Sequence, residues 1–522
     1  MFCFHLGILI FAPFLNKLEK KGLQNIRQWI VAILLGCQNI EQSKELNYSS
    51  LNKIIGKSYK TLHLQRLCLK DSATKGNKKL VMQFNAELLD VNQQNDFYYD
   101  PHTKHYSGHL KILATWCPSV RLADKGINMD YIHTTSGHPV YFNTNDNFYD
   151  LRERFFANIN DFRAMSGFDR EKVLTHIIDR GIYSLDVFQS VIEDPYNHII
   201  TWEKGYEKDK WNEGAASKKG HIEKKKNNNE DVSLIHYRYQ VGRWEKQSSM
   251  RQIIVRIYDK NWKNLIEVSI LTDDNFRPAD QVIELMLKRW VQENDFKYTI
   301  KHFGLNQITS YAFTDYKAVK DKIEDKFFIC SKHKALTKEI HKIRNKLKTA
   351  LLRKYKFEKK HKEDQNEKLS LKKQEQKTKI WNKIKHLNAS LSELERQRKE
   401  STKYVSKIDE LIDNDYYKLD TNTKDFMDAI KMLARNMFYL SFEPFKHRYN
   451  NFRDDHVLFR HLTRSPGTMV KTPDVIKIKL NPQMEYQPKL KKIISEVLKD
   501  INEMKPEIPD GSKRKIEITL NN

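Results

Sequence analysis

Hydrophobic residues change their spacing along this chain, and the changes divide it into segments with different predicted structures. Near the N-terminus they recur at helical intervals, as in Ile26, Trp29, Ile30 and Ile33. Between residues 95 and 202, short β-patterned runs come first and then alternate with a helical segment. That order predicts an α/β fold whose sheet is partly antiparallel.

Five runs rich in β-branched and aromatic residues are predicted to form this sheet. They are Asp96–Asp100, Met129–Thr134, Val140–Thr144, Val173–Ile178 and His198–Trp202. The Ser136-Gly137 pair lies between the second and third runs and predicts a hairpin. The segment from Asn147 to Met165 is apolar at helical intervals, which predicts a helix capped by Asn147.

A second β-rich region separates this sheet from a later helix. Runs over Ser233–Gln240, Gln252–Tyr258 and Leu265–Leu271 predict a β insertion. The polar stretch Glu213–Asn229 beside them is predicted to be a mobile loop. The helix that follows is predicted over Ala279–Tyr298.

Positive charge is concentrated in the region after that helix. Residues 331–410 hold 25 Lys and Arg against 11 Asp and Glu, a net +14 within a chain of +25. Apolar residues keep heptad-like spacing in two stretches that are separated near Lys359–Asn366, which predicts an antiparallel helical hairpin. Both a solvated helix pair and a DNA-binding surface fit this pattern. Further on, alternation predicts strands over Val475–Leu480 and Lys515–Leu520.

The charge and the cysteines restrict the partners and the compartment. A chain of +25 with a pI near 9.5 suits a polyanion, for which DNA or RNA is the usual choice, and a lysine-rich genome is the alternative explanation. The five cysteines form no CxxC pair, which argues against a zinc or disulfide framework and favours a reducing cytosol.

The apolar start of the chain is the one segment that resembles a targeting sequence. Met1 to Leu15 is too short to span a bilayer and lacks a basic region and a cleavage site. We therefore expect a cytoplasmic, nucleoid-associated protein with no membrane partner. We also expect the chain to begin inside a hydrophobic core, as a truncated copy would.

Three acidic residues have settings that suit metal ligands. Asp100 and Asp179 each end a predicted strand, and Glu293 lies on the predicted basic helix. Two-metal phosphoryl transfer needs carboxylates from different elements that converge on divalent cations. Mg²⁺ prefers such oxygen ligands, and Mn²⁺ is the expected substitute. With the basic charge, this set predicts metal-dependent phosphoryl transfer on nucleic acid.

The segments around these acids resemble those of bacterial DDE transposases from insertion sequences, in particular the cut-and-paste group with a β insertion before the last acid. Phe97–Gly108 resembles the strand of the first aspartate, and Ile177–Gly181 resembles that of the second. Arg289-Trp290-x-x-Glu293-x-x-x-Lys297 resembles the helix of the third residue. The similarity covers roughly residues 20–315, and Met286 departs from the tyrosine that the group often has there.

The resemblance implies that Asp100, Asp179 and Glu293 bind the metals and catalyse the reaction. Arg289 and Lys297 would contact DNA phosphates, and Trp290 would pack beside an unpaired base. His102, Lys104 and His105 complete the set of predicted DNA-binding residues. The implied reaction is hydrolysis at the ends of a mobile element in double-stranded DNA, followed by strand transfer into target DNA. Because two ends must be joined in one event, a homodimer on DNA is expected.

The implied fold is α/β, with an RNase H-like catalytic core interrupted by the β-rich insertion and flanked by helical N-terminal and basic helical C-terminal regions. The predicted regions are a helical, truncated DNA-binding part (1–90), the core's first part (91–202), the insertion (203–275), the core's second part with Glu293 (276–316), the basic hairpin (317–423) and an α+β segment (424–522).

Two alternatives remain from the residues alone. A metal-dependent nuclease or phosphohydrolase would be centred on Asp100, His102 and His105, whose imidazoles suit a divalent metal. A catalytically dead remnant of a transposase would bind DNA through the basic hairpin. Asp124, Asp130 and Asp146 are further carboxylates that compete for a place near the metals.

Overall fold

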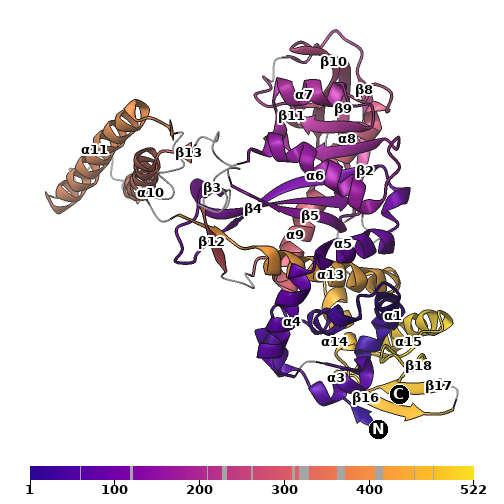
Figure 1. The fold of residues 1–522 in the computed structure, drawn as a ribbon. Coiled ribbons are helices and arrows are strands. Elements are labelled where there is room, and N and C mark those ends of the chain that lie inside the picture. The colour runs from indigo at the N-terminus through magenta and orange to yellow at the C-terminus, as the bar shows by residue number, and fades with distance from the viewer. Residues whose placement is uncertain are drawn as a thin grey trace.

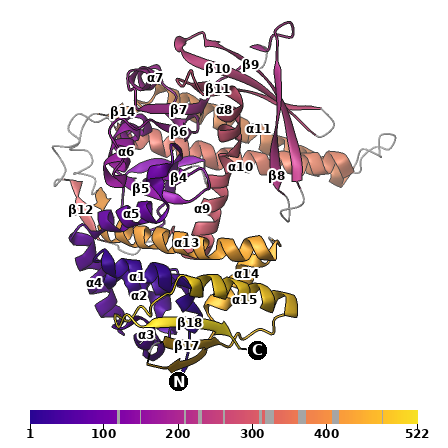
Figure 2. The same ribbon diagram turned by 90° about the vertical axis from the view of Figure 1, so that its right-hand side faces the viewer.

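The computed structural model describes residues 1–58, 60–117, 121–147, 149–207, 210–225, 232–259, 263–307, 312–316, 328–360, 371–405, 416–451, 453–473 and 475–521. Figures 1 and 2 show an α/β part built on a large sheet, a mainly helical part packed against one end of it, and a two-helix arm that stands to one side. Among the described residues, no helix is long and apolar enough to cross a membrane.

Ten strands form the central sheet of the α/β part. In chain order they are β2 (Asp96–His105), β3 (Ala114–Cys117), β4 (Leu122–Thr134), β5 (Pro139–Asn145), β6 (Leu174–Ile178), β7 (Asn197–Trp202), β8 (Lys218–Lys225), β9 (Val232–Trp244), β10 (Gln247–Tyr258) and β11 (Asn264–Thr272). Their spatial order is β3-β4-β2-β6-β7-β11-β10-β9-β8, and β5 also pairs with β4. β2 runs parallel to β6 and β6 to β7, whereas the other described pairings are antiparallel.

Helices cover both faces of the sheet. On one face lie α6 (Leu151–Ser166) and α7 (Leu185–Ile192), and on the other lie α8 (Ala279–Lys288) and α9 (Trp290–Phe303). On the first face, the ring of Phe97 packs 5.0 Å from that of Phe162 of α6. On the second, Tyr98 shares an apolar cluster with Val282 and Ile283 of α8. Adjacent residues of β2 thus point into two separate cores, as the period of two requires.

The helical part is organised around α13 (Asn422–Tyr449), which is buried on every side from Lys424 to Phe438. Around it lie α1 (Ala12–Lys20), α2 (Arg27–Leu34), α3 (Tyr48–Ile55), α4 (Leu62–Thr74), α5 (Asn77–Leu88), α14 (Asp455–Thr463) and α15 (Pro488–Glu503). The apolar start of the chain forms a buried 3-10 helix over Leu6–Phe11 in the same core.

Segments from the two ends of the chain share one sheet in this part. Its order is β1 (Phe2–Cys3), β16 (Gly467–Lys471), β17 (Val475–Leu480) and β18 (Lys515–Leu520). β17 and β18 coincide with the two strands predicted from alternation. The predicted N-terminal and C-terminal regions therefore pack as one body, which the sequence did not indicate.

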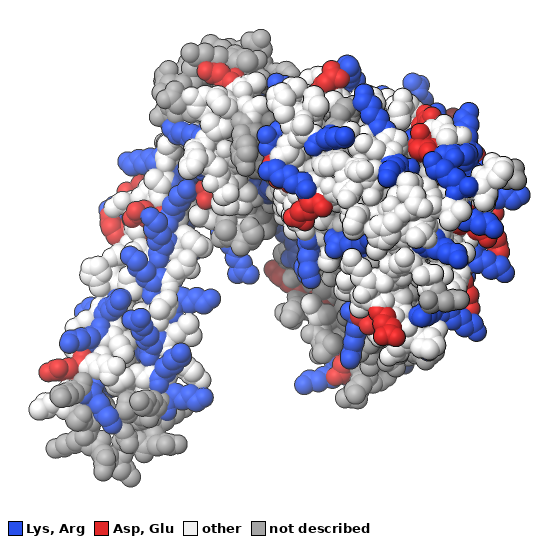
Figure 3. Space-filling model, turned by 90° about the horizontal axis from the view of Figure 1, so that it is seen from below, with Lys and Arg blue, Asp and Glu red and all other residues white. Residues whose placement is uncertain are grey.

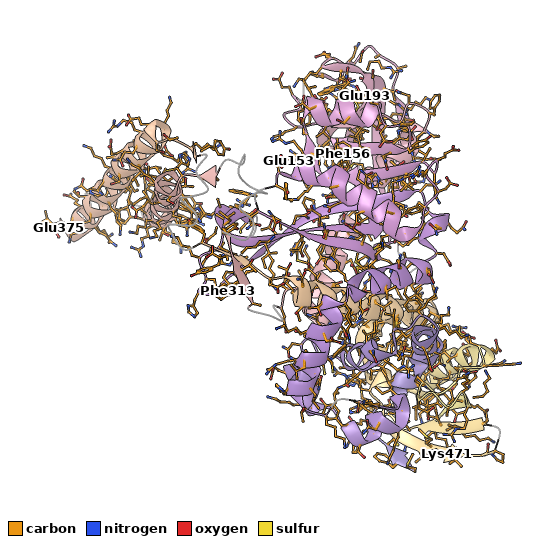
Figure 4. All side chains as sticks on the ribbon, viewed as in Figure 1. Glu153, Phe156, Glu193, Phe313, Glu375 and Lys471 are labelled. Atoms are coloured by element: carbon orange, nitrogen blue, oxygen red, sulfur yellow. The ribbon has the colours of Figure 1, made fainter. Side chains whose placement is uncertain are left out.

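The arm consists of α10 (Ser331–Lys360) and α11 (Leu371–Glu400). Arg344 of α10 donates to Glu395 near the end of α11 at 2.6 Å, and His333 lies 2.9 Å from Ser401, so the helices run antiparallel as predicted. Two short ribbons lie where the arm joins the body, β12 (Phe313–Asp315) with β15 (Tyr417–Leu419) and β13 (Phe328–Ile329) with β14 (Tyr404–Val405). In Figure 4, Phe313 marks this base and Glu375 the far end of the arm.

The insertion contains one strand that was predicted to be a loop, and it pairs with the main sheet, about which the sequence made no prediction. Residues 218–225, expected within a mobile loop, form β8 and pair with β9 from Lys218↔Tyr239 to Lys225↔Val232. An edge strand tolerates such a lysine-rich sequence because one side of it faces solvent. In addition, β11 pairs with β7, so the insertion continues the main sheet instead of forming a separate one.

Two predicted helix boundaries are also wrong. α6 begins at Leu151, where Asp150 and Glu153 form a capping box, whereas the Asn147 side chain donates to the carbonyls of Leu113 and Gly126. Phe148, which lies within the segment predicted to be helical, is outside the described residues. The single helix expected over Ala279–Tyr298 is two helices that meet at Arg289.

Candidate active site

Asp100 lies within β2, and Asp179 directly follows the paired strand β6. The parallel ladder of β2 and β6 ends with the pair Tyr99↔Ile178, and the next residue along each chain segment is the aspartate. Paired strands lie roughly 4.8 Å apart, and residues in register point to the same face of a sheet. The sheet therefore places these two carboxylates side by side.

Asp100 faces the junction of α8 and α9. Because side chains alternate along a strand, Asp100 shares its face of β2 with Tyr98 and His102. The Tyr98 hydroxyl donates to the carbonyl of Leu285 in α8 at 3.1 Å. The His102 ring stacks on Phe296 of α9, with centroids 5.2 Å apart. Asp100 lies between these contacts and so points at the place where the two helices meet.

Glu293 reaches the same place from the first turn of α9. Arg289 donates from Nη2 to Glu293 Oε1 at 3.0 Å, and the same nitrogen lies 3.9 Å from Asp179 Oδ2. The Arg289 side chain is 13% exposed, whereas those of Glu293 and Asp179 are 50% and 46% exposed. The guanidinium thus lies between two of the predicted acids, and both remain accessible from solvent.

Electrostatics link Asp100 to the same group of charges. Burial raises the pKa of the Asp100 carboxyl to about 7, Arg289 opposes this rise, and the carboxylates of Glu293 and Asp179 add to it. Three carboxylates and one guanidinium therefore act on each other here, and near neutral pH the group favours additional positive charge.

The donor set fits a hard divalent cation in its chemistry, because it consists of carboxylate oxygens that repel one another. The side-chain positions that the structure describes, however, do not form a metal site. Within the described part of the chain, no three His, Cys, Asp or Glu side chains lie where they could hold one ion together. Arg289 occupies the space between Asp179 and Glu293. Metal binding would therefore require Arg289 to move away from these two carboxylates.

A buried polar network, which sequence reasoning missed, fixes α9 beneath Glu293. Gln292 Nε2 lies 3.1 Å from His133 Nδ1 of β4, and His133 Nε2 lies 3.5 Å from Asp295 Oδ2. Asp295 also forms an ion pair with Arg435 of α13. These partners are 140 and 159 residues apart in sequence, and no local pattern distinguishes Asp295 from a solvated helical residue.

Three predicted DNA-binding residues lie beside the acids. Trp290 is 45% exposed at the start of α9, and Lys297 is exposed one helical turn beyond Glu293. Arg289 is the third, and it contacts the carboxylates as described above. These side chains surround Glu293 on the solvent side of α9.

The other three predicted DNA-binding residues lie along β2. His102 is half-buried against Phe296, and His105 is exposed with its Nε2 3.5 Å from Asp124. Lys104 is only 7% exposed, and burial followed by the charge of Lys424 lowers its pKa to about 7. A buried ammonium cannot reach a DNA phosphate in this conformation, so we do not carry Lys104 forward as a DNA contact.

The competing carboxylates have other partners. Asp130 is fully buried on the α6 face of the sheet, where Arg154 donates to it at 2.6 Å. Asp124 and Asp146 pair with Lys338 and Lys418 at 3.1 and 2.6 Å. Each of these three carboxylates is therefore paired with a basic side chain within the fold.

The alternative site centred on Asp100, His102 and His105 is not assembled. His105 is five residues from Asp100, so it points to the opposite face of β2, roughly 16 Å along the strand. The two imidazoles contact different parts of the molecule.

Two of the comparisons with known proteins give matches that extend over most of the chain. A family model described as "Transposase protein" matches residues 90–439, which include the three acids and the arm. No curated protein matches the sequence. Among solved structures, a piggyBac transposase chain from a synaptic complex with hairpin DNA is similar over 75% of both chains, with 11% identity and a TM-score of 0.26. A likeness at that level supports no conclusion about this chain.

The family model, in contrast, is a match of the sequence itself, and it spans well over half of the 522 residues. On this match, the chain belongs to the transposase protein family.

Proposed function

We propose that this chain is a DNA transposase of the DDE type with an RNase H-like catalytic core. The strand order β5-β4-β2-β6-β7 supports the core assignment. Three antiparallel strands are followed in space by two parallel ones, and the first of the proposed acids ends up on the central strand, as such a core requires. We also propose that it is of the bacterial insertion-sequence group.

The observation that carries the proposal is the meeting of Asp100, Asp179 and Glu293. They come from β2, the end of β6 and α9, and they interact around Arg289. Asp100 lies within β2 and Asp179 directly follows the neighbouring strand β6, and regular elements fix a site more firmly than loops do. Carboxylates that are separated widely in sequence and collected in space are what metal-dependent phosphoryl transfer needs.

In the proposed reaction, Asp100, Asp179 and Glu293 would hold Mg²⁺, or Mn²⁺ in its place. The bound ions would supply an activated water or 3′-hydroxyl and stabilise the leaving oxygen. Arg289, once released from Glu293, is placed to donate to a phosphate of the scissile strand. Trp290 is exposed beside it and can stack on an unpaired base.

The substrate would be double-stranded DNA, first at the element's ends and then at the target. The freed 3′-hydroxyl would attack the target phosphodiester, so strand transfer needs no covalent protein intermediate. A homodimer on DNA would bring two ends together in one event.

The test is an assay of the full chain on DNA that carries the sequences flanking its own reading frame. With Mg²⁺ or Mn²⁺ we expect new 3′-hydroxyl ends and products joined to a target plasmid, and with a chelator we expect neither. Salt-sensitive DNA binding without cleavage under either ion would identify a catalytically dead remnant. Cleavage that is unaffected by the chelator would contradict the metal-dependent mechanism.

A further inference from the structure

The arm is a pair of antiparallel helices with its own small core. Ile340 and Ala350 of α10 and Leu387 of α11 are buried between the helices. Lys354 extends over the ring of Trp381, with its Nζ 4.6 Å from the ring centroid. Apolar residues at heptad spacing explain why these helices hold together away from the body. The remaining faces are free to take a different role.

Those faces carry a large excess of positive charge. α10 and α11 together hold 21 Lys and Arg against six Asp and Glu, a net +15 of the chain's +25. The folded arm therefore concentrates more than half of the charge in a small part of the molecule.

One face of α10 carries a basic stripe. We define it as Lys338, Lys342, Lys346, Arg353 and Lys356, whose spacings of three, four and seven place them on one side of the helix. At 1.5 Å per residue the stripe is about 27 Å long, which parallels roughly eight base pairs of duplex. Lys338 lies 3.1 Å from Asp124 of β4, so the stripe begins at the catalytic sheet and runs outward.

Beyond Lys338, the charges of the basic stripe are not neutralised within the part of the fold that the structure describes. Lys342, Lys346, Arg353 and Lys356 are exposed, and none of them forms an ion pair with another residue that the structure describes. Several acids of the arm pair elsewhere, for example Glu395 with Arg344 and Glu358 with Lys354. Four adjacent cations without counter-charges favour a polyanionic partner.

The arm stands beside a hollow in the molecular surface. Figure 3 shows it separated from the body by an open space, with Lys and Arg side chains on the arm and on the facing parts of the body. Figures 1 and 2 place β2, β6 and α9, which position the three acids, in the body, while the arm extends separately from it. An elongated anion could therefore contact both the arm and the body.

We propose that the arm is a DNA clamp in which the basic stripe of α10 follows the phosphate backbone of duplex DNA without reading its sequence. This inference rests on the proposed function, to which it adds a binding surface. Lysine dominates the stripe, and lysine acts as a point charge toward phosphate, whereas base recognition uses bidentate Arg, Asn or Gln. The clamp holds DNA that the catalytic acids cut or join.

The test compares two variants of the full chain with the same change in net charge. The arm variant carries Lys342→Gln, Lys346→Gln, Arg353→Gln and Lys356→Gln. The matched control carries Lys477→Gln, Lys479→Gln, Lys489→Gln and Lys492→Gln, all exposed on β17 and α15 of the helical part. Glutamine and lysine have similar helix propensities, so circular dichroism should show both variants folded.

The measurement is the affinity for a 30-base-pair duplex of arbitrary sequence between 50 and 250 mM salt, by fluorescence anisotropy. Each lost phosphate contact reduces the magnitude of the negative slope of log K against log salt by about 0.9, so the slope of the arm variant should be smaller in magnitude by up to about 3.6. At 100 mM salt we expect its affinity to fall at least roughly tenfold, and that of the control to change less than about threefold.

Three outcomes separate the two proposals. Loss of slope in the arm variant alone supports the clamp. Equal losses in the arm variant and the control, or none in either, would overturn the clamp while leaving the transposase proposal standing. A wild-type chain that does not bind duplex DNA at all would overturn both.

Discussion

Asp100, Asp179 and Glu293 were proposed from local patterns that are weak one by one, and the structure brings the three together around Arg289. The first two were expected to end apolar or aromatic strands, although β2 continues past Asp100 to His105. The third lies among Arg289, Trp290 and Lys297 in a recognisable spacing. The position of Arg289 was predictable only in part. Its place on the face of Glu293 follows from helical spacing, but its contact with Asp179 depends on the tertiary fold.

Lys104 was predicted to contact DNA, but the structure buries its side chain. Its strand neighbours suggested a DNA-facing position, yet its Nζ is buried without a hydrogen-bond partner among the described residues. What buries it is α13, which contributes Lys424, Asp428 and Lys431 to its surroundings from more than 300 residues away in sequence. No pattern within β2 contains that information.

Replacing this ammonium tests its environment. We expect Lys104→Met to raise the free energy of unfolding at pH 7 by about 1–3 kcal/mol, because a buried unpaired donor is removed while the aliphatic packing is kept. The duplex affinity should not change. Urea unfolding of both proteins is the measurement.

The pH dependence provides the control for that variant. The pKa of Lys104 is about 7 in the fold, below its ordinary value of 10.5, so unfolding takes up a proton between these limits. Wild-type stability gains from this group as the pH rises from 7 toward 10.5, and the advantage of the variant should shrink accordingly. A constant or growing advantage, or a loss of duplex affinity, would contradict the buried position.

At the scale of elements, the positions of most sheet strands were predictable, but their lengths and pairing partners were not. β2, β4, β5, β6 and β7 overlap the predicted runs, although β2 extends to His105, β4 begins at Leu122, and β3 was not predicted. β8 was missed because its lysines hide an edge strand, and the break between α8 and α9 was missed because helical periodicity continues through Arg289. Both features depend on contacts with residues distant in sequence, which a short stretch of sequence does not contain.

The contact of α9 with α13 is the element-level feature that positions Glu293. It depends on the buried pair of Asp295 and Arg435, and Arg435 also lies over the ring of Tyr439 at 4.0 Å. We expect Arg435→Met to lower the free energy of unfolding by about 3–5 kcal/mol, because an uncompensated carboxylate would stay buried. Chemical denaturation would measure this loss.

A double-mutant cycle separates that pair from general packing. Asp295→Asn combined with Arg435→Met should cost clearly less than the sum of the two single changes, since no lone charge remains in the double variant. Strict additivity would mean that the pair does not connect the two helices.

At the scale of the whole molecule, the order of regions along the chain did not predict how they assemble. Phe2 and Cys3 pair with β16, so both ends of the chain complete one body. The insertion extends the main sheet, and the hairpin of charge +15 becomes an arm beside a hollow. Hydrophobic patterning indicates which faces are buried, but the choice of partner for each face is made by long-range packing.

The central claim is that three carboxylates from separate elements act as one catalytic set, and one measurement tests it most directly. Metal-dependent 3′-end cleavage would be compared in wild type, Asp100→Asn, Asp179→Asn and Glu293→Gln, with Asp146→Asn as a matched carboxylate outside the site. We predict that each of the three variants loses at least roughly 10²-fold in rate while the control keeps nearly full activity. Cleavage that persists in Glu293→Gln at the wild-type rate would contradict the proposed site.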